Sequence, residues 1–306
     1  MNILYICPNF DHYIYSYYGL IIHGLKQLGH NVTPIRYLDS NILNNYDVII
    51  FGYRGFNKNL YGKKINTNTK MYNLLGAQSS QEFKEKGITL NENNIISLCT
   101  MFRINHLTQN YFKNIIPFNY SFYPDIFKDY NKEKIYDIGM TGAAHEASKY
   151  PDDSFTTDEK NNRIRLYKLL DSMKDKYNIF KKCNDDVSKG RIISDVEYAE
   201  TINSSKIWIS CSAAYGDCCR HFQIPSCKTL LFCNEPIESH PFETIFKNNE
   251  NCVFFKNDLS DFKEKVDYYL TNEDEYNRIV NNGYKEFHEK HTNVQRAKEL
   301  IKIIES

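Results

Sequence analysis

The sequence predicts an α/β protein with two lobes, each built on a parallel sheet. Short apolar runs alternate with amphipathic helical segments in both halves, an order typical of parallel strands joined by right-handed crossovers. A length of 306 residues fits two domains better than one, because single cores stop growing beyond roughly 250–300 residues. We place the boundary near Tyr130, in a turn-and-linker composition. This gives an N-terminal domain over 1–130 and a C-terminal domain over 131–306, whose last helix is able to return to the first domain.

The first lobe opens with a strand–helix–strand series. An apolar run over 2–7 predicts a buried strand, and apolar residues at helical spacing over 13–28 predict a helix that ends at Gly29. The next apolar runs predict strands at 31–36 and 46–52. The same reasoning predicts, further along, strands at 70–74, 95–99 and 115–118 and a helix at 105–112.

The second lobe repeats this organisation. A strand over 136–142 runs into Gly142, and a helix over 162–176 follows a polar loop. The remaining predicted strands lie at 177–180, 206–210, 229–233 and 251–255, and the remaining helices at 196–204, 220–227, 260–270, 274–290 and 294–304.

Composition and charge exclude several functional classes. Thirty-eight Lys and Arg residues balance 38 Asp and Glu residues, so the broad basic field required for non-specific nucleic-acid binding is missing. The longest apolar runs, such as 48–51 and 229–233, are far shorter than the roughly 20 residues of a membrane span, so we expect no transmembrane segment. The first residues lack the basic start of a secretory signal. Nine cysteines without a CxxC pair fit reduced thiols and predict a cytoplasmic protein.

Two features of the second lobe suit a phosphate ligand. The strand that ends at Gly142 allows the backbone to approach an anion closely, although such turns are also common structural joints and a GxGxxG pattern is absent. Arg163 and Arg165 follow at the start of the next helix, on different faces. One of them is expected to point at the ligand; the alternative is that both are solvated surface charges.

The densest signal lies over 210–232, where a strand leads into a loop of small residues, a short helix and another apolar strand. Such a loop lies at the carboxyl ends of a parallel sheet, where open α/β folds bind ligands. Arg220 is the expected phosphate contact, and its alternative is a structural arginine paired with an acid.

In order, these motifs resemble the group-one-type, spore-maturation-like glycosyltransferases. The resemblance is carried by Arg220–His221–Phe222–Gln223 and Ser226–Cys227–Lys228, and it continues through Asn249–Val253 to the His291–Thr292 pair before Arg296. It covers essentially the whole second lobe and is looser in the first. It implies the GT-B architecture, in which two Rossmann-like domains face each other across a cleft, the first binding the acceptor and the second a nucleotide-diphosphate sugar.

The resemblance also implies site residues. Thr141 and Gly142 approach the diphosphate, Arg220 clamps it, and the segment from Lys189 to Ile193 passes the nucleobase. The signature region adds further expected donor contacts at Tyr215, Gly216, Gln223, Ser226 and Cys227. Two residues depart from the family pattern: Gln223 stands where many relatives have Glu, and Lys228 where Gly is usual.

The expected chemistry uses the sugar donor as co-substrate and no metal ion. Transfer leaves negative charge on the departing diphosphate, which cations or amides must stabilise. The chain has no Asp-x-Asp motif, so we expect Arg220, an arginine at the helix start and backbone amides to replace the ion. Asp11 and His12 follow the first strand and are the candidate base, unless they form a loop pair without a catalytic role.

Two other functions stay open at this stage. A degenerate transferase would bind a nucleotide or glycan, or scaffold a partner, without turnover, and Gln223 and Lys228 motivate this alternative. A sugar-nucleotide epimerase would share the architecture but give product without an acceptor. The sequence does not specify the donor sugar or the acceptor, which is expected to be a sugar, a lipid or a protein.

Overall fold

A computed structural model gives the fold over residues 1–7, 17–37, 40–52, 67–75, 95–99, 115–143, 157–184, 194–211, 218–235 and 245–306. Contacts divide the chain into two units. Unit 1 contains Met1–Tyr123 and Lys290–Ser306, and unit 2 contains Pro124–Glu238 and Glu243–Glu289. Each unit has its own parallel sheet and its own apolar core.

The sheet of unit 1 is formed by the apolar runs that the sequence presents in order. Its described strands are β1 (Asn2–Ile6), β2 (Asn31–Ile35), β3 (Val48–Phe51), β4 (Lys70–Leu75), β5 (Ile95–Cys99) and β6 (Ile115–Pro117). They lie in the order β2-β1-β3-β4-β5-β6, and every neighbouring pair is parallel. Residues Ile3 to Ile6 of β1 are fully buried, as expected for a central strand covered on both faces.

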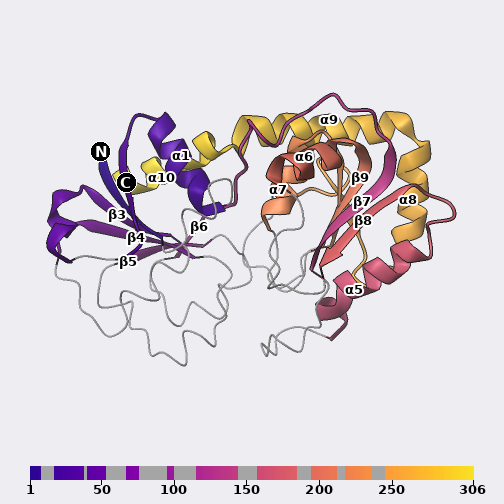
Figure 1. The fold of residues 1–306 in the computed structure, drawn as a ribbon, viewed down its shortest axis with the longest axis horizontal. Coiled ribbons are helices and arrows are strands. Elements are labelled where there is room, and N and C mark those ends of the chain that lie inside the picture. The colour runs from indigo at the N-terminus through magenta and orange to yellow at the C-terminus, as the bar shows by residue number, and fades with distance from the viewer. Residues whose placement is uncertain are drawn as a thin grey trace. The chain divides into compact units, whose positions relative to one another are not determined.

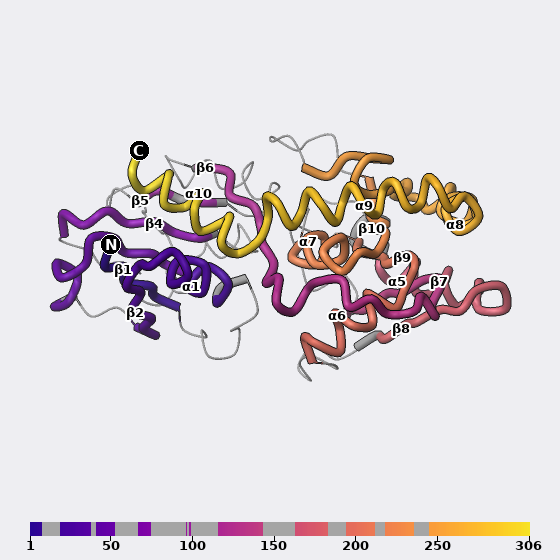
Figure 2. The backbone as a smooth tube through the Cα atoms, turned by 90° about the horizontal axis from the view of Figure 1, so that it is seen from above, coloured from indigo at the N-terminus to yellow at the C-terminus, as the bar shows by residue number. Residues whose placement is uncertain are grey.

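Helices from both ends of the chain pack together on unit 1. The helix α1 (Tyr17–Gln27) contacts α10 (Asn293–Glu305), and the two lie side by side in Figures 1 and 2. The Thr292 hydroxyl caps α10 by accepting from the Gln295 amide at 3.3 Å. A short 3-10 helix, η2 (Ser40–Asn45), precedes β3. The carboxyl-terminal segment is therefore part of the first unit.

Unit 2 has a sheet of the same kind. Its described strands are β7 (Tyr136–Ala143), β8 (Ile179–Asn184), β9 (Ser205–Ser210), β10 (Leu230–Asn234) and β11 (Val253–Phe255). They are ordered β11-β10-β9-β7-β8, again with parallel neighbours. The helices of this unit are α5 (Thr157–Asp171), α6 (Asp195–Asn203), α7 (Cys219–Ser226), α8 (Phe262–Thr271) and α9 (Glu273–Lys290).

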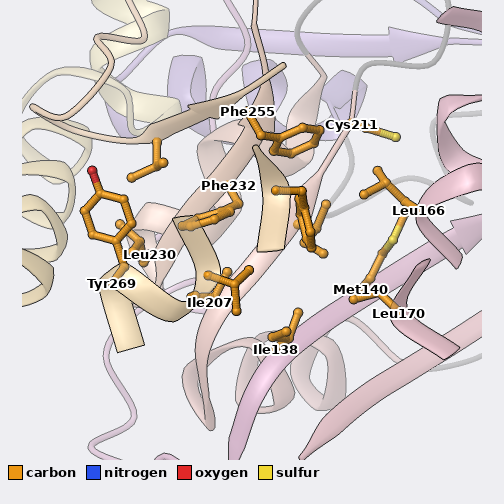
Figure 3. Packing of buried hydrophobic residues seen from close by; sticks show 14 of the residues in the cluster. Ile138, Met140, Leu166, Leu170, Ile207, Cys211, Leu230, Phe232, Phe255 and Tyr269 are labelled. Carbon is orange, nitrogen blue, oxygen red and sulfur yellow. The ribbon is translucent and has the colours of Figure 1, made fainter. Parts of the chain in front are cut away.

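The core of unit 2 lies between the sheet and the helices α5 and α8. Strand residues such as Ile138, Ile207 and Phe232 meet Leu166 of α5 and Tyr269 of α8 in one cluster, shown in Figure 3. Its members come from the alternating apolar positions of the strands and from helical spacing in the helices. The core includes residues of both β7 and β9, which are neighbouring interior strands of this sheet.

Most elements lie within a few residues of their predicted positions, and α5 is an exception. The predicted helix over 162–176 is shifted, because α5 ends at Asp171 and turns over 172–176 bury Met173. The predicted helix over 105–112 lies outside the described residues.

Candidate functional site

The candidate site lies in unit 2, at the carboxyl ends of β7 and β9. β7 has β8 on one side and β9 on the other, so successive connections leave the sheet in opposite directions at this point. Open α/β sheets bind ligands at such a switch point, beyond the carboxyl ends of the strands. Thr141 and Gly142 lie near the end of β7, and Cys211 follows β9.

Gly142 is the point where two arginines meet. Its φ of +141° is a backbone conformation that residues other than glycine rarely adopt. A Cβ placed there would lie 3.4 Å from Nη1 of Arg220 and 3.7 Å from Cδ of Arg163. The Tyr167 hydroxyl donates to the Gly142 carbonyl at 3.0 Å and fixes the backbone at this position. The glycine therefore leaves its backbone open beside two guanidinium groups.

Arg163 and Arg165 of α5 contact different parts of unit 2, as their spacing on the helix predicts. Nη2 of Arg163 lies 3.5 Å from the carbonyl of Cys211, at the end of β9. Nη2 of Arg165 instead donates to the Asp258 carbonyl at 2.7 Å, on the side of β11. Arg163 thus belongs to the Gly142 site, and the structure does not bring Arg165 to it.

Arg220 comes from the first turn of α7 and is half-buried. The electrostatic interaction with Cys218 raises the pKa of the Arg220 guanidinium, and this effect is larger than the lowering of the pKa by burial. Within the described part of the chain, Arg220 makes no hydrogen bond and no ion pair with a carboxylate. Its donors are therefore available to an anionic ligand.

Cys218 is the electrostatic partner of Arg220. Burial alone raises the pKa of its thiol, but Arg220 and His221 outweigh that effect and hold the pKa well below its usual value. Sγ of Cys218 lies 3.4 Å from Nδ1 of His221, and the Cys218 amide donates to the same nitrogen at 3.2 Å. Cys218 directly precedes α7. Its thiol, Arg220 and His221 therefore lie together at the amino-terminal end of this helix, which is the positive end of the helix dipole.

The other residues expected in the donor site have different placements. Gln223 lies about one turn beyond Arg220 on α7 and is 4% exposed. Ser226 and Cys227 lie at the opposite end of α7, toward the amino ends of the strands, and the structure does not bring them to Gly142. The Ser226 hydroxyl donates to the Phe222 carbonyl at 2.6 Å, and burial raises the pKa of the Cys227 thiol. The remaining expected residues lie outside the described part of the chain: Asp11, His12, Lys189, Ile193, Tyr215 and Gly216.

Tyr167 and Cys218 are the residues of this site that sequence reasoning missed. Tyr167 stands one helical turn after Arg163, so its place on the same face of α5 was readable from spacing. Cys218 stands two residues before Arg220, within the densest segment, but nothing in the sequence orients its thiol toward a guanidinium.

The described residues contain neither a metal-binding cluster nor a membrane-spanning helix. No three His, Cys, Asp or Glu side chains gather in the described ranges in a way that would hold a metal ion. In the same part of the chain, every helix is too short or too polar to cross a bilayer.

Part of the chain matches a known protein family. Residues 163–302 match a family described as glycosyl transferase-like. The matched segment contains Arg163, Arg220 and the strands β9 to β11. No curated protein sequence matches significantly.

Solved structures with the same fold extend over the whole chain. An α-glucosyltransferase described in complex with UDP-glucose and DNA containing an abasic site has a TM-score of 0.66 at 10% identity, covering 99% of both chains. Sucrose-phosphate synthase from Thermosynechococcus elongatus has a TM-score of 0.67 at 10% identity, covering 99% of this chain and 98% of its own. HepE from Anabaena, described in complex with UDP and glucose, has a TM-score of 0.63 at 8% identity, covering 100% of both chains.

These findings confirm the fold and the enzyme class that the sequence predicts. The architecture is that of the GT-B glycosyltransferases, with a parallel sheet in each of two α/β units. The glycosyl transferase-like match over residues 163–302 agrees with this assignment.

Proposed function

We propose that the protein transfers a sugar from a nucleotide-diphosphate sugar to an acceptor, with unit 2 holding the donor. The observation that carries this proposal is the meeting of Arg163 and Arg220 at Gly142, beyond the carboxyl end of a central parallel strand. Two guanidinium groups beside an open glycine backbone suit the two charged phosphates of such a donor. UDP is the nucleotide to test first, since the complexes described for several neighbours contain UDP or UDP-glucose.

The proposed chemistry places positive charge where the leaving group develops negative charge. Breaking the bond between the sugar and the diphosphate leaves an additional negative charge on the diphosphate, and donors already fixed in place stabilise it without reorganisation. Arg220, Arg163 and the amino-terminal end of α7 supply that charge, and we propose that no metal ion is required.

The acceptor side of the reaction belongs to unit 1 in this proposal. Asp11 or His12 would take the proton of the acceptor hydroxyl, since both follow β1 at its carboxyl end. An intracellular location is part of the same proposal, and it is supported by seven cysteines whose side chains the structure describes, all of them free thiols.

The test is the release of nucleoside diphosphate from a panel of UDP-, GDP- and dTDP-sugars, with and without sugar, lipid and protein acceptors. We expect Arg220→Ala to lower the rate by roughly 10²–10³-fold, as for the loss of one oxyanion donor. Arg278→Ala is the control, because Arg278 is an exposed arginine of α9 paired with Glu275 at 2.6 Å. A wild-type rate in Arg220→Ala would refute the role of this arginine.

The same panel tests a second function, a binding protein without turnover. It is favoured by Gln223, which replaces a charged acceptor with a neutral one, and by Lys228 at a position where glycine is usual. Saturable donor binding without release, across all acceptors, would establish that function instead.

A further inference from the structure

A hollow of about 490 Å³ lies in unit 2 at the amino-terminal ends of the strands, at the edge of the sheet opposite Gly142 and Arg220. Lys134 precedes β7, Lys206 is the second residue of β9 and Lys228 precedes β10. The helix α9 forms another wall. Its volume is in the range of small-molecule sites, which extends from about 300 to 1,000 Å³. Its position separates it from the candidate donor site.

The charged side chains that line the hollow are predominantly basic. Lysines 132, 134, 206 and 228 face two acids, Asp129 and Glu273. Three of the four lysines have carboxylate partners, which are Lys132 with Glu200 at 3.5 Å, Lys206 with Asp137 at 2.9 Å and Lys228 with Asp129 at 3.0 Å. The lysines of these pairs are 40–44% exposed, so the pairs contribute little and rearrange at little cost.

Lys134 differs from the other three lysines. Its Nζ donates to the Lys228 carbonyl at 2.8 Å and to the Thr229 hydroxyl at 3.1 Å, and it has no carboxylate within 4.0 Å among the described residues. An ammonium group has three donors, so one is left for a ligand. Burial lowers the pKa of this group to about 8; Cys227 and Asp129 oppose that effect, and Lys228 reinforces it. A partly buried cation without an anion is costly, and a bound anion would remove that cost.

We propose that this hollow binds a small phosphate-bearing anion, with Lys134 as its principal contact and Lys206 and Lys228 beside it. Asp129 and Glu273 are the carboxylates of the lining that oppose an anion. Asp129 is paired with Lys228 at 3.0 Å, and Glu273 lies exposed at the start of α9, where solvent and salt screen it. The shared chemistry is the phosphate group, free or esterified. The site is independent of the donor site and does not rest on the proposed function.

The test uses calorimetric titration of the full chain in the Arg220→Ala background, which removes the principal expected phosphate contact of the donor site. Inorganic phosphate, glucose 1-phosphate and uridine monophosphate are the probes. We expect one saturable site, and we expect the further change Lys134→Met to weaken binding roughly tenfold or more, as for one charge-assisted hydrogen bond. Lys263→Met, a lysine on the exposed side of α8, is the matched control and should change the affinity less than twofold.

Two further measurements keep the proposal open to refutation if Lys134→Met folds poorly. Lys206→Met does not touch the turn that Lys134 holds, and we expect it to weaken binding several-fold. Sulfate stays a dianion at neutral and alkaline pH. The affinity of the hollow for sulfate should therefore fall as the pH rises through about 8, where the Lys134 ammonium loses its proton. The corresponding Lys134→Arg variant should show no such fall.

The outcomes separate the ligand sources. Equal affinity for the three probes identifies a site for free phosphate, and a preference for one ester identifies a site that also binds the organic part. Absence of phosphate binding in the parent, or equal binding in Lys134→Met and Lys263→Met, would overturn the proposal. Neither result bears on the role of Arg220.

Discussion

Lys228 holds a backbone conformation that glycine adopts more easily. Its φ is +53°, and it directly follows the C-cap residue Cys227, where helices commonly end in a left-handed residue. The Lys228 amide donates to the Pro225 carbonyl at 2.9 Å, so the turn that ends α7 depends on this conformation. The Lys228 side chain forms a partly exposed ion pair with Asp129 at 3.0 Å, which contributes little to stability.

Replacing Lys228 separates the backbone effect from the ion pair. Lys228→Gly and Lys228→Ala both remove the pair, but only glycine relieves the left-handed conformation. We therefore expect the glycine variant to have the higher free energy of unfolding, by about 1 kcal/mol, in denaturant titrations. Equal stability, or a more stable alanine variant, would show that this turn carries no strain.

At the same scale, the sequence predicts the site only in part. The spacing of Arg163 and Arg165 shows that they lie on different helix faces, but it does not show which of them faces Gly142. Ser226 and Cys227 were expected with Arg220 because they share its segment. α7 carries them away from the site because a helix rises about 1.5 Å per residue toward the opposite edge of the sheet.

Among the elements, β7 and β9 depend on a close contact between Gly139 and Trp208. The two residues are register partners, and the Trp208 ring, fully buried, lies over the glycine and stacks on Phe180 with 5.8 Å between ring centroids. A Cβ on Gly139 would lie 2.9 Å from Cδ2 of the ring and closer still to two other ring carbons. At position 139, where β7 lies beside Trp208 of β9, only the hydrogen side chain of glycine fits.

Gly139→Ala should therefore destabilise unit 2. We expect the free energy of unfolding to fall by about 3 kcal/mol, the upper range for overpacking a core. In a Trp208→Leu background the same change should cost much less, because the smaller side chain leaves room. An equal cost in both backgrounds, measured by denaturant unfolding, would show that the ring is not the obstacle.

The bounds of α5 were harder to predict from the sequence than those of most other elements, since α6, α7, α9 and α10 each begin and end within one residue of their predicted bounds. The apolar runs also predict β1, β5 and β9 to within one residue, since each contains a short apolar run. α5 begins at Thr157 with a polar turn that carries no apolar period, so its start was invisible to a periodicity argument.

On the scale of the whole molecule, the chain forms two units, each with its own parallel sheet and its own core. Unit 2 carries the arginine site and most of the matched family segment, whose last residues, 290–302, lie in unit 1 together with the rest of α10. The order of strands and helices, and hence the fold class, could be predicted from the sequence because it rests on local periodicity. The electrostatic interaction between Arg220 and Cys218 could not be predicted from the sequence, because it arises only when α7 packs on the sheet.

The most direct test of the central claim is calorimetric measurement of UDP binding to a pair of arginine variants on one helix. Arg163→Ala removes a guanidinium beside Gly142, whereas Arg165→Ala removes one that bonds the Asp258 carbonyl. We predict that Arg163→Ala weakens UDP binding about tenfold or more and that Arg165→Ala changes it less than about twofold. Equal losses in the two variants, or unchanged affinity in Arg163→Ala, would contradict the account.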